Sequence, residues 1–199
     1  MPKQNPYKGR DRFTAAAQSA GYPARSVFKL QEIDRRVRIF RAGQRVLDLG
    51  SSPGSWSMYA CEKVGPKGHV LSIDLNPLSQ ELPQNAVFVQ GDALDVASEV
   101  YKEHGPFDIV LSDLAPKTTG NRLGDQTRSF ELFMHALDVA EAHLAAGGVF
   151  VGKIFMGEDM AVARARVKKM FTSERLIRPE SVREQSKEIF CVGEKKLPA

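Results

Sequence analysis

The sequence has few of the residues and patterns that mark secreted, membrane or metal-binding proteins. Its 199 residues include only two cysteines, Cys61 and Cys191, which form no C-x-x-C pattern, so we expect reduced thiols rather than a disulfide or a zinc site. The four histidines show no ligand spacing, and we predict no metal site. No window approaches the ~18 apolar residues of a membrane span, and no apolar stretch follows the basic N-terminus as in a secretion signal. These absences favour a cytoplasmic protein with no membrane partner.

The composition is that of an ordinary globular protein, with 42% hydrophobic and 26% charged residues. A chain of this length buries one core without disulfides or structural metals. We predict a single domain over residues 21–199 and a monomer. We expect residues 1–20 to form a basic arm that is mobile or a short helix and that contributes nothing to the core.

Positive charge is concentrated near the N-terminus. Residues 1–46 contain eleven Lys or Arg and three acidic residues, a local charge of +8 in a chain whose net charge is +4, so the remainder carries about −4. This asymmetry favours an arm that binds a polyanion, although a solvated helix face explains a charge run equally well.

Hydrophobic periodicity predicts the secondary structure. Apolar residues recur at three- and four-residue steps from Ala24 to Phe40, which predicts an amphipathic helix with arginines on its opposite face. Later strands are predicted at Arg45–Leu49, His69–Asp74, Ala86–Val89, Phe107–Ser112, Val149–Phe155, Arg175–Arg178 and Glu188–Gly193. The clearest helices between them are predicted at Trp56–Val64, Arg128–Leu144 and Glu158–Phe171.

This alternation of strands and helices predicts an α/β protein with a doubly wound, Rossmann-like fold. Its sheet would have seven mostly parallel strands with helices on both faces. No repeat, long linker or second composition zone follows Gly43. We therefore expect the chemistry to lie on loops at the carboxyl ends of the strands.

The first predicted strand ends in a glycine-bearing turn, VLDLGSSPGSW (residues 46–56). Glycines let the backbone approach a ligand, and the following helix N-terminus favours an anion, so the turn indicates a nucleotide-like ligand. It is not G-x-G-x-x-G, and the chain lacks room for a dehydrogenase substrate domain, which makes a dinucleotide the weaker reading. Asp48 is a candidate for orienting the backbone of this turn.

Two acidic residues end the next two predicted strands. Asp74 lies twenty residues after Gly54, where a carboxylate can accept hydrogen bonds from both ribose hydroxyls of a nucleoside. Asp92 either serves the same site or caps a helix that begins near Ala93. Trp56 is the single tryptophan, and it either belongs to the core or packs on the ligand.

Three further charged residues, Asp113, Lys153 and Glu188, interrupt or border apolar strand runs. A lysine inside a central strand is costly to bury unless it is paired, so Lys153 is a candidate functional residue. The alternative is a lysine at a strand end whose ammonium group reaches solvent.

The motifs SVFKL, DLGSSPGSW, SDLAP, GGVFVGKIF and SKEIF occur in an order that resembles the FtsJ/RrmJ (RlmE) family of ribosomal RNA 2′-O-methyltransferases, over roughly residues 20–195. The resemblance implies a methyltransferase fold and a catalytic tetrad of Lys29, Asp113, Lys153 and Glu188. It also implies that the cofactor S-adenosylmethionine is bound by Gly54, Trp56, Asp74, Asp92 and Asp113. The chain departs from the family at Ser55, where a second glycine is common; a small residue should be tolerated there.

The same resemblance implies methylation of the 2′-hydroxyl of a uridine ribose in 23S ribosomal RNA, within the large subunit. The tetrad has no Cys or His, which leaves Lys153 as the general base. An unperturbed lysine, with a pKa of ~10.4, is protonated at neutral pH; Lys29 and burial would lower the pKa, whereas Asp113 and Glu188 would raise it. We expect Asp113 to orient Lys153 and the cofactor, Glu188 to hold the acceptor or Lys153, and Lys29 to contact a phosphate or tune Lys153.

The basic N-terminal region then supplies RNA contacts, from Lys and Arg between Lys3 and Arg38, and reversing Arg35 and Arg36 to Glu would test them. Three alternatives remain. A transfer RNA 2′-O-methyltransferase of the same family would share every motif, and a non-catalytic RNA-binding assembly protein would share the fold. A metal-dependent small-molecule methyltransferase is disfavoured, because the chain has a lysine in place of a cluster of carboxylate ligands.

Overall fold

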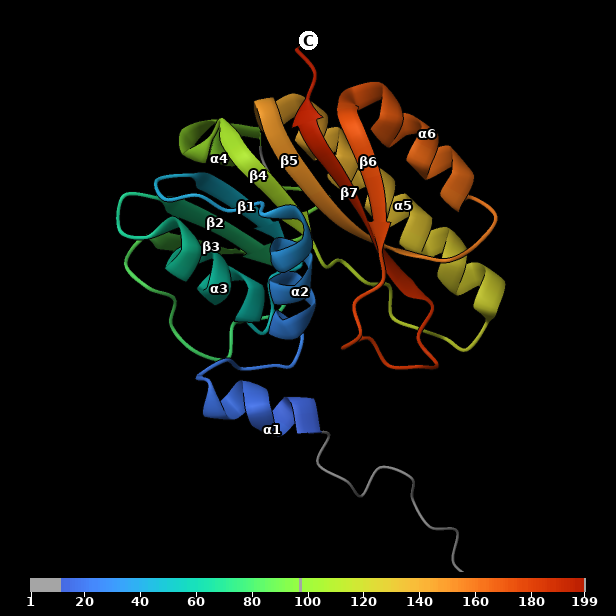
Figure 1. The fold of residues 1–199 in the computed structure, drawn as a ribbon, viewed down its shortest axis with the longest axis horizontal. Helices are drawn as coiled ribbons and strands as arrows, with labels where there is room; N and C mark the ends of the chain where they lie inside the picture. The colour runs from blue at the N-terminus through green and yellow to red at the C-terminus, as the bar shows by residue number, and fades with distance from the viewer. Residues whose placement is uncertain (1–11, 97, 199) are drawn as a thin grey trace, which may run out of the picture.

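The computed structural model describes residues 12–96 and 98–198. Within them, a seven-stranded sheet has the order β3-β2-β1-β4-β5-β7-β6 (Figure 1). The strands are β1 (Arg45–Leu49), β2 (His69–Asp74), β3 (Ala86–Gln90), β4 (Phe107–Ser112), β5 (Leu144–Phe155), β6 (Phe171–Ile177) and β7 (Glu188–Lys196). The helices are α1 (Arg12–Ser19), α2 (Val27–Val37), α3 (Ser55–Val64), α4 (Ser98–His104), α5 (Arg122–His143) and α6 (Met160–Met170).

The sheet is mostly parallel. Strands β1 to β5 pair in parallel, and β7 lies antiparallel between β5 and β6. From the centre, the chain builds outward through β1, β2 and β3 on one side and then through β4 and β5 on the other. The loops after β1 and β4 therefore diverge, which opens a crevice at the carboxyl ends of these strands. The predicted doubly wound fold is confirmed.

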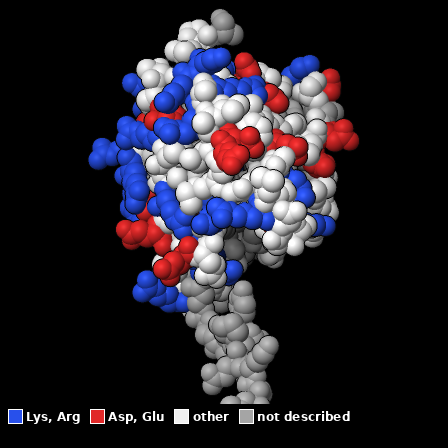
Figure 2. Space-filling model, turned by 90° about the vertical axis from the view of Figure 1, so that its right-hand side faces the viewer, with Lys and Arg blue, Asp and Glu red and all other residues white. Residues whose placement is uncertain are grey.

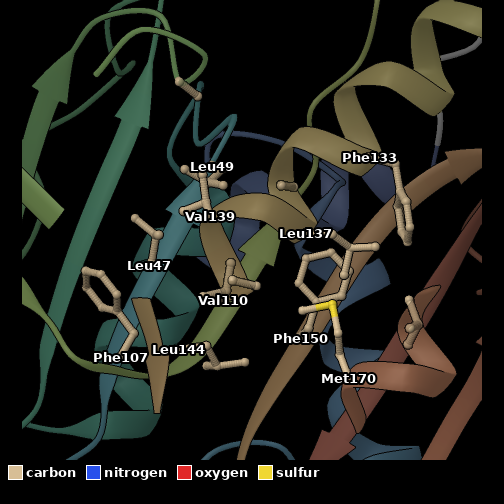
Figure 3. Packing of buried hydrophobic residues seen from close by; sticks show 14 of the residues in the cluster. Leu47, Leu49, Phe107, Val110, Phe133, Leu137, Val139, Leu144, Phe150 and Met170 are labelled. Atoms are coloured by element: carbon tan, nitrogen blue, oxygen red, sulfur yellow. The ribbon is translucent and has the colours of Figure 1, made fainter. Parts of the chain in front are cut away.

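Two hydrophobic clusters cover the two faces of the sheet. Figure 3 shows part of the first, in which Val110 of β4 and Phe150 of β5 pack with Phe133 and Leu137 of α5. The second joins alternate strand residues to α2 and α3, and it includes Val46, Val151, Leu30, Ile33, Trp56 and Ala60. Side chains two apart on a strand share a face, so Lys153 points to the same side as Val151, toward α2 and α3.

Several element boundaries differ from the predicted ones. Helix α5 begins at Arg122, six residues before the predicted Arg128, because the Asn121 side chain accepts a hydrogen bond from the Gly124 N–H and caps the helix at this earlier position. Strand β5 begins at Leu144 and includes the glycine pair at 147–148 that was expected to precede it. No helix begins near Ala93 in the described residues; α4 begins at Ser98.

The expectation that residues 1–20 contribute nothing to the core was wrong for the described part. Residues Arg12–Ser19 form helix α1, and Ala17 is fully buried in the cluster that contains Tyr22, Val27 and Leu30. A small residue on one helix face allows close approach to α2, and the ring of Phe13 also lies 5.8 Å from that of Phe28. The basic residues before Arg12, including Lys3, lie outside the described residues.

Candidate active site

The turn after β1 is built around two glycines with positive φ. Gly50 has φ 78°, and a Cβ there would lie 2.9 Å from the backbone N of Leu114, so the turn fits closely against the loop after β4. Gly54 has φ 113° and is the N-cap of α3, and its N–H donates to the carbonyl of Ser51 at 2.7 Å. Gly50 thus lets the loops after β1 and β4 lie close together, and Gly54 forms the start of α3.

A cavity of about 790 Å³ lies at the carboxyl ends of β1 to β4. Its walls come from the four loops after these strands and from α5, and they include Gly50, Ser52, Asp74, Asn76, Asp92, Leu94, Asp113, Leu114, Pro116, Lys117, Thr119, Arg128 and Leu132. The structure thus brings together Asp74, Asp92 and Asp113, three of the five residues expected to bind the cofactor.

Asp74 and Asp92 each organise a loop as well as lining the cavity. The Asp74 carboxylate accepts hydrogen bonds from the backbone N–H of Ser52 at 2.9 Å and of Asn76 at 2.7 Å. Asp92 accepts one from the N–H of Leu94 at 2.9 Å, which closes a turn and does not cap a helix. A carboxylate has about four acceptor positions, so both residues keep capacity for a ligand's donors.

Gly54 and Trp56 are not among the residues that line the cavity. Trp56 is 2% exposed, its Nε1 donates to the carbonyl of Ser26 at 2.8 Å, and its ring lies 5.6 Å from that of Phe190. The indole therefore joins α2, α3 and β7 in the core. Of the two interpretations of this tryptophan, the structure supports core packing.

Lys153 and Asp113 form a direct pair at the edge of the cavity. The Nζ atom of Lys153 donates to Oδ1 of Asp113 at 2.8 Å and to its backbone carbonyl at 2.6 Å. The lysine side chain is 5% exposed and the aspartate side chain 18% exposed. Asp113 lines the cavity and Lys153 does not, so Asp113 is the link between the cavity and the lysine.

Lys29 and Glu188 form the second pair. Lys29 Nζ lies 2.6 Å from Oε1 of Glu188, and both side chains are 13% exposed. The Lys29 ammonium also lies 5.9 Å from the ring centre of Phe190, and Phe190 is directly opposite Lys153 in the β5–β7 register. The four expected tetrad residues therefore meet on one face of the sheet, as two lysine–carboxylate pairs.

Asp48 lies buried below the glycine turn. Its Oδ2 accepts a hydrogen bond from Ser57 Oγ at 2.6 Å, and Ser57 Oγ in turn accepts one from Ser72 Oγ at 2.8 Å. Desolvation by burial raises the pKa of Asp48 to about 7, and the nearby carboxylates of Asp113 and Asp74 add to this effect. Asp48 therefore binds side chains beneath the turn, and no bond to the turn backbone is seen.

Asp125 and its hydrogen-bond partners, which shape the cavity wall after β4, were not predicted from the sequence. Asp125, in the first turn of α5, accepts hydrogen bonds from the backbone N–H of Thr119 at 3.0 Å and of Gly120 at 3.3 Å, and from Arg128. The hydrogen bond from Thr119 is the main cause of a lowered pKa at Asp125. An aspartate in the first turn of a helix was the available signal, but that helix was predicted to begin too late.

In the part of the chain that the structure describes, no helix has both the length and the hydrophobicity needed to cross a bilayer.

The face in Figure 2, on the α5 and α6 side of the molecule, carries several groups of Lys and Arg with fewer acidic side chains between them.

Comparison with known proteins gives concordant matches. Residues 22–196 match the FtsJ-like methyltransferase family. A ribosomal RNA large subunit methyltransferase E from Sorangium cellulosum is 56% identical over 196 residues, which is 98% of this chain and 92% of the relative. One from Bdellovibrio bacteriovorus is 51% identical and covers 94% of this chain and 97% of its own length.

Solved structures share the fold. A protein described as a ribosomal RNA methyltransferase from Plasmodium falciparum superposes with a TM-score of 0.79 at 25% identity, over 89% of this chain and 100% of the other. Fibrillarin from Aeropyrum pernix, which holds S-adenosylmethionine, has a TM-score of 0.57 at 14% identity, over 77% of this chain and 67% of the other.

Proposed function

Because the chain belongs to the FtsJ-like methyltransferase family, which takes its methyl group from S-adenosylmethionine, we propose that it methylates a uridine 2′-hydroxyl in the 23S RNA of the large ribosomal subunit. The curated relatives are named as large-subunit ribosomal RNA methyltransferases, which supports this substrate. The proposal rests mainly on the position of Asp113, which lines the cavity and whose Oδ1 accepts a hydrogen bond from Nζ of Lys153 at 2.8 Å.

The cavity suits the cofactor in size and chemistry. About 790 Å³ is within the range of small-molecule sites, and its walls combine apolar residues with carboxylates. Asp74 and Asp92 would accept hydrogen bonds from the ribose hydroxyls and the adenine amino group, and Asp113 would lie toward the sulfonium end. Bound there, S-adenosylmethionine supplies an electrophilic methyl group.

Lys153 would act as the general base on the acceptor hydroxyl. A neutral amine has two N–H donors and one lone pair, and Asp113 offers two acceptors to Lys153, its carboxylate and its carbonyl. With both donors engaged, the lone pair is the position left to take the hydroxyl proton. Because Asp113 also lines the cavity, it would hold the base at the edge of the cofactor site, and alignment supplies much of the rate enhancement.

Lys29 and Glu188 would hold the acceptor nucleotide beside Lys153. They lie on the same face of the sheet, and their charges compensate each other while both remain 13% exposed. A partly exposed carboxylate can accept a hydrogen bond from a ribose hydroxyl, and the ammonium can contact a phosphate. These are the first of the two alternative roles expected for each residue from the sequence.

RNA would bind through the basic N-terminal region. Arg35, Arg38 and Arg41, in and after α2, are exposed, whereas Arg36 is engaged with the carboxylate of Glu32. Contacts to phosphates raise affinity by releasing counterions, so binding should weaken steeply with salt. We further propose that the protein acts as a monomer in the cytoplasm on RNA assembled in the large subunit.

Nucleotide-resolution mapping of 2′-O-methyl groups in total RNA, with and without this protein, tests the proposal. The expected result is one uridine in 23S RNA that loses its methyl group when the protein is absent and regains it with the wild-type protein. Restoration should fail with the Lys153→Met variant. A lost methyl group in transfer RNA, or no change in any RNA, would overturn the proposed substrate.

A further inference from the structure

Three contacts join α2 and the residues just before it to the segment between β6 and β7 (residues 178–187) and to Glu188, the first residue of β7. The Lys29–Glu188 pair lies at the end of this segment. Near its beginning, Oε2 of Glu32 accepts a hydrogen bond from the backbone N–H of Glu180 at 2.7 Å, and Arg25 donates to the carbonyl of Ser181 at 2.5 Å. Residues about 150 positions apart in sequence are thus fixed to each other.

Among the three residues in or just before α2 that make these contacts, Glu32 is the most buried. The residue is 7% exposed, and its other oxygen receives the guanidinium of Arg36. A buried carboxylate is costly unless it is paired, and an apolar residue would often serve packing as well. What the carboxylate adds is a directional bond to one backbone N–H of the β6–β7 segment.

Glu32 also lies on the same side of α2 as Lys29. Residues three apart on a helix are neighbours on its surface, so a contact at Glu32 controls the rotation and the height of α2 at Lys29. Lys29 lies 5.9 Å from the ring centre of Phe190, which is the register partner of Lys153. The position of α2 therefore decides where the Lys29–Glu188 pair lies relative to Lys153.

We propose that Glu32 is a positioning residue for methyl transfer: its bond to Glu180 holds α2 and β7 in the arrangement that places the Lys29–Glu188 pair beside Lys153. The proposal rests on the proposed function of that site. A displacement of about 1 Å in a catalytic arrangement can lower the rate about 100-fold. We therefore expect the rate to depend on this one hydrogen bond between Glu32 and the Glu180 N–H, which we call the tether. Neither Glu32 nor Glu180 lines the cavity, so cofactor binding should not depend on the bond.

The test compares three variants of the full-length protein. Glu32→Met keeps most of the side-chain volume but removes the acceptor for the Glu180 N–H. Glu32→Gln keeps an acceptor oxygen and serves as the conservative rescue. Glu174→Met removes another buried, ion-paired carboxylate, 3% exposed and bound by Arg164, outside both α2 and the cavity, and it leaves the Glu32–Glu180 bond intact, so it is the matched control.

Large ribosomal subunits from cells lacking this protein serve as the acceptor, and kcat and the KM for S-adenosylmethionine are measured well below the melting temperature of each variant. We expect Glu32→Met to lower kcat about 10-fold or more with an unchanged KM. Glu32→Gln and Glu174→Met should remain within about 3-fold of the wild type, since both retain the tether. If Glu32→Met does not fold, Glu180→Pro removes the same bond from its donor side and should give the same loss of kcat.

Failure of the two proposals would look different. A wild-type protein that transfers no methyl group to RNA overturns the proposed function and this role with it. An active wild type combined with a Glu32→Met variant of lower melting temperature but full kcat overturns the positioning role alone. A loss in Glu174→Met equal to that in Glu32→Met would also overturn it, because the removal of any buried, ion-paired carboxylate, and not the loss of the tether, would then be responsible.

Discussion

Replacing Lys153 by Met should abolish methyl transfer while S-adenosylmethionine still binds. Lys153 does not line the cofactor cavity, and its contact with the site runs through Asp113. A positioned general base contributes about 100- to 10,000-fold to a rate, so kcat should fall by at least about 100-fold. Calorimetry should give a dissociation constant for S-adenosylmethionine within about 3-fold of the wild-type value, a change of less than ~1 kcal/mol.

The same substitution has a stability effect that must be separated from catalysis. Removing Lys153 leaves the Asp113 carboxylate, 18% exposed, without its ion-pair partner. Loss of one partner of a buried hydrogen bond costs about 1–3 kcal/mol, and solvent contact at Asp113 places the expected value in the lower half of that range. Thermal unfolding of the wild type and the variant gives this loss directly, and activity is then measured where both are folded.

Lys153→Arg is the matched control for charge. Arginine keeps a cation and donors for Asp113, but it does not give up a proton in proteins, so it cannot act as a base. We expect Lys153→Arg to recover stability relative to Lys153→Met and to remain inactive in single-turnover assays. Activity of either variant within about 10-fold of the wild type would refute the role of Lys153 as general base.

Three further predictions address the cavity wall, the RNA contacts and the buried carboxylate. Asp125→Ala removes the bonds to Thr119 and Gly120 and should weaken S-adenosylmethionine binding about 10-fold in calorimetry, as loss of a supporting hydrogen-bond partner often does; unchanged affinity would contradict this. Arg35→Glu combined with Arg41→Glu should raise the KM for RNA and reduce its salt dependence without changing cofactor affinity, and an unaltered KM would exclude this face. Burial raises the pKa of Asp48 to about 7 in the folded state, whereas its pKa in the unfolded chain is about 4. Between these two values the folded state holds a proton that the unfolded chain has released, so stability should fall as pH rises from about 4 to about 7. Asp48→Asn should flatten this slope in thermal unfolding, and identical slopes would refute the assignment.

Much of the fold could be predicted from the sequence because it depends on local patterns. Strand β1 and strand β4 have the predicted bounds, since short β-branched and Leu-rich runs determine buried parallel strands. Boundaries set by side-chain caps were harder, as at α5, where Asn121 adds turns that hydrophobic periodicity does not reveal. The burial of Ala17 was missed because an alanine carries little pattern information, and only the proximity of α2 makes its small size useful.

The candidate site, like the fold, could be predicted only in part from the sequence. Residue type and position in the sequence identified Asp113, Lys153 and Glu188 as candidates, because a charged residue in or beside an apolar strand is costly unless it has a function or a partner. Lys29, in a predicted helix, was a candidate only through the resemblance to the FtsJ/RrmJ family. Asp113 was expected to orient Lys153, and the two side chains are in direct contact in the structure. The pairing of Lys29 with Glu188 was not predicted and is seen only in the structure.

The sequence by itself determined which residue types face the carboxyl edge of the sheet, since strand periodicity and loop position are properties of the local chain. Only the tertiary structure decided that Trp56 turns into the core, that Lys29 pairs with Glu188, and that Glu32 forms a hydrogen bond that joins α2 to the β6–β7 segment. These contacts join residues far apart in the chain, and their distances depend on how whole helices and strands pack. No local pattern contains that information.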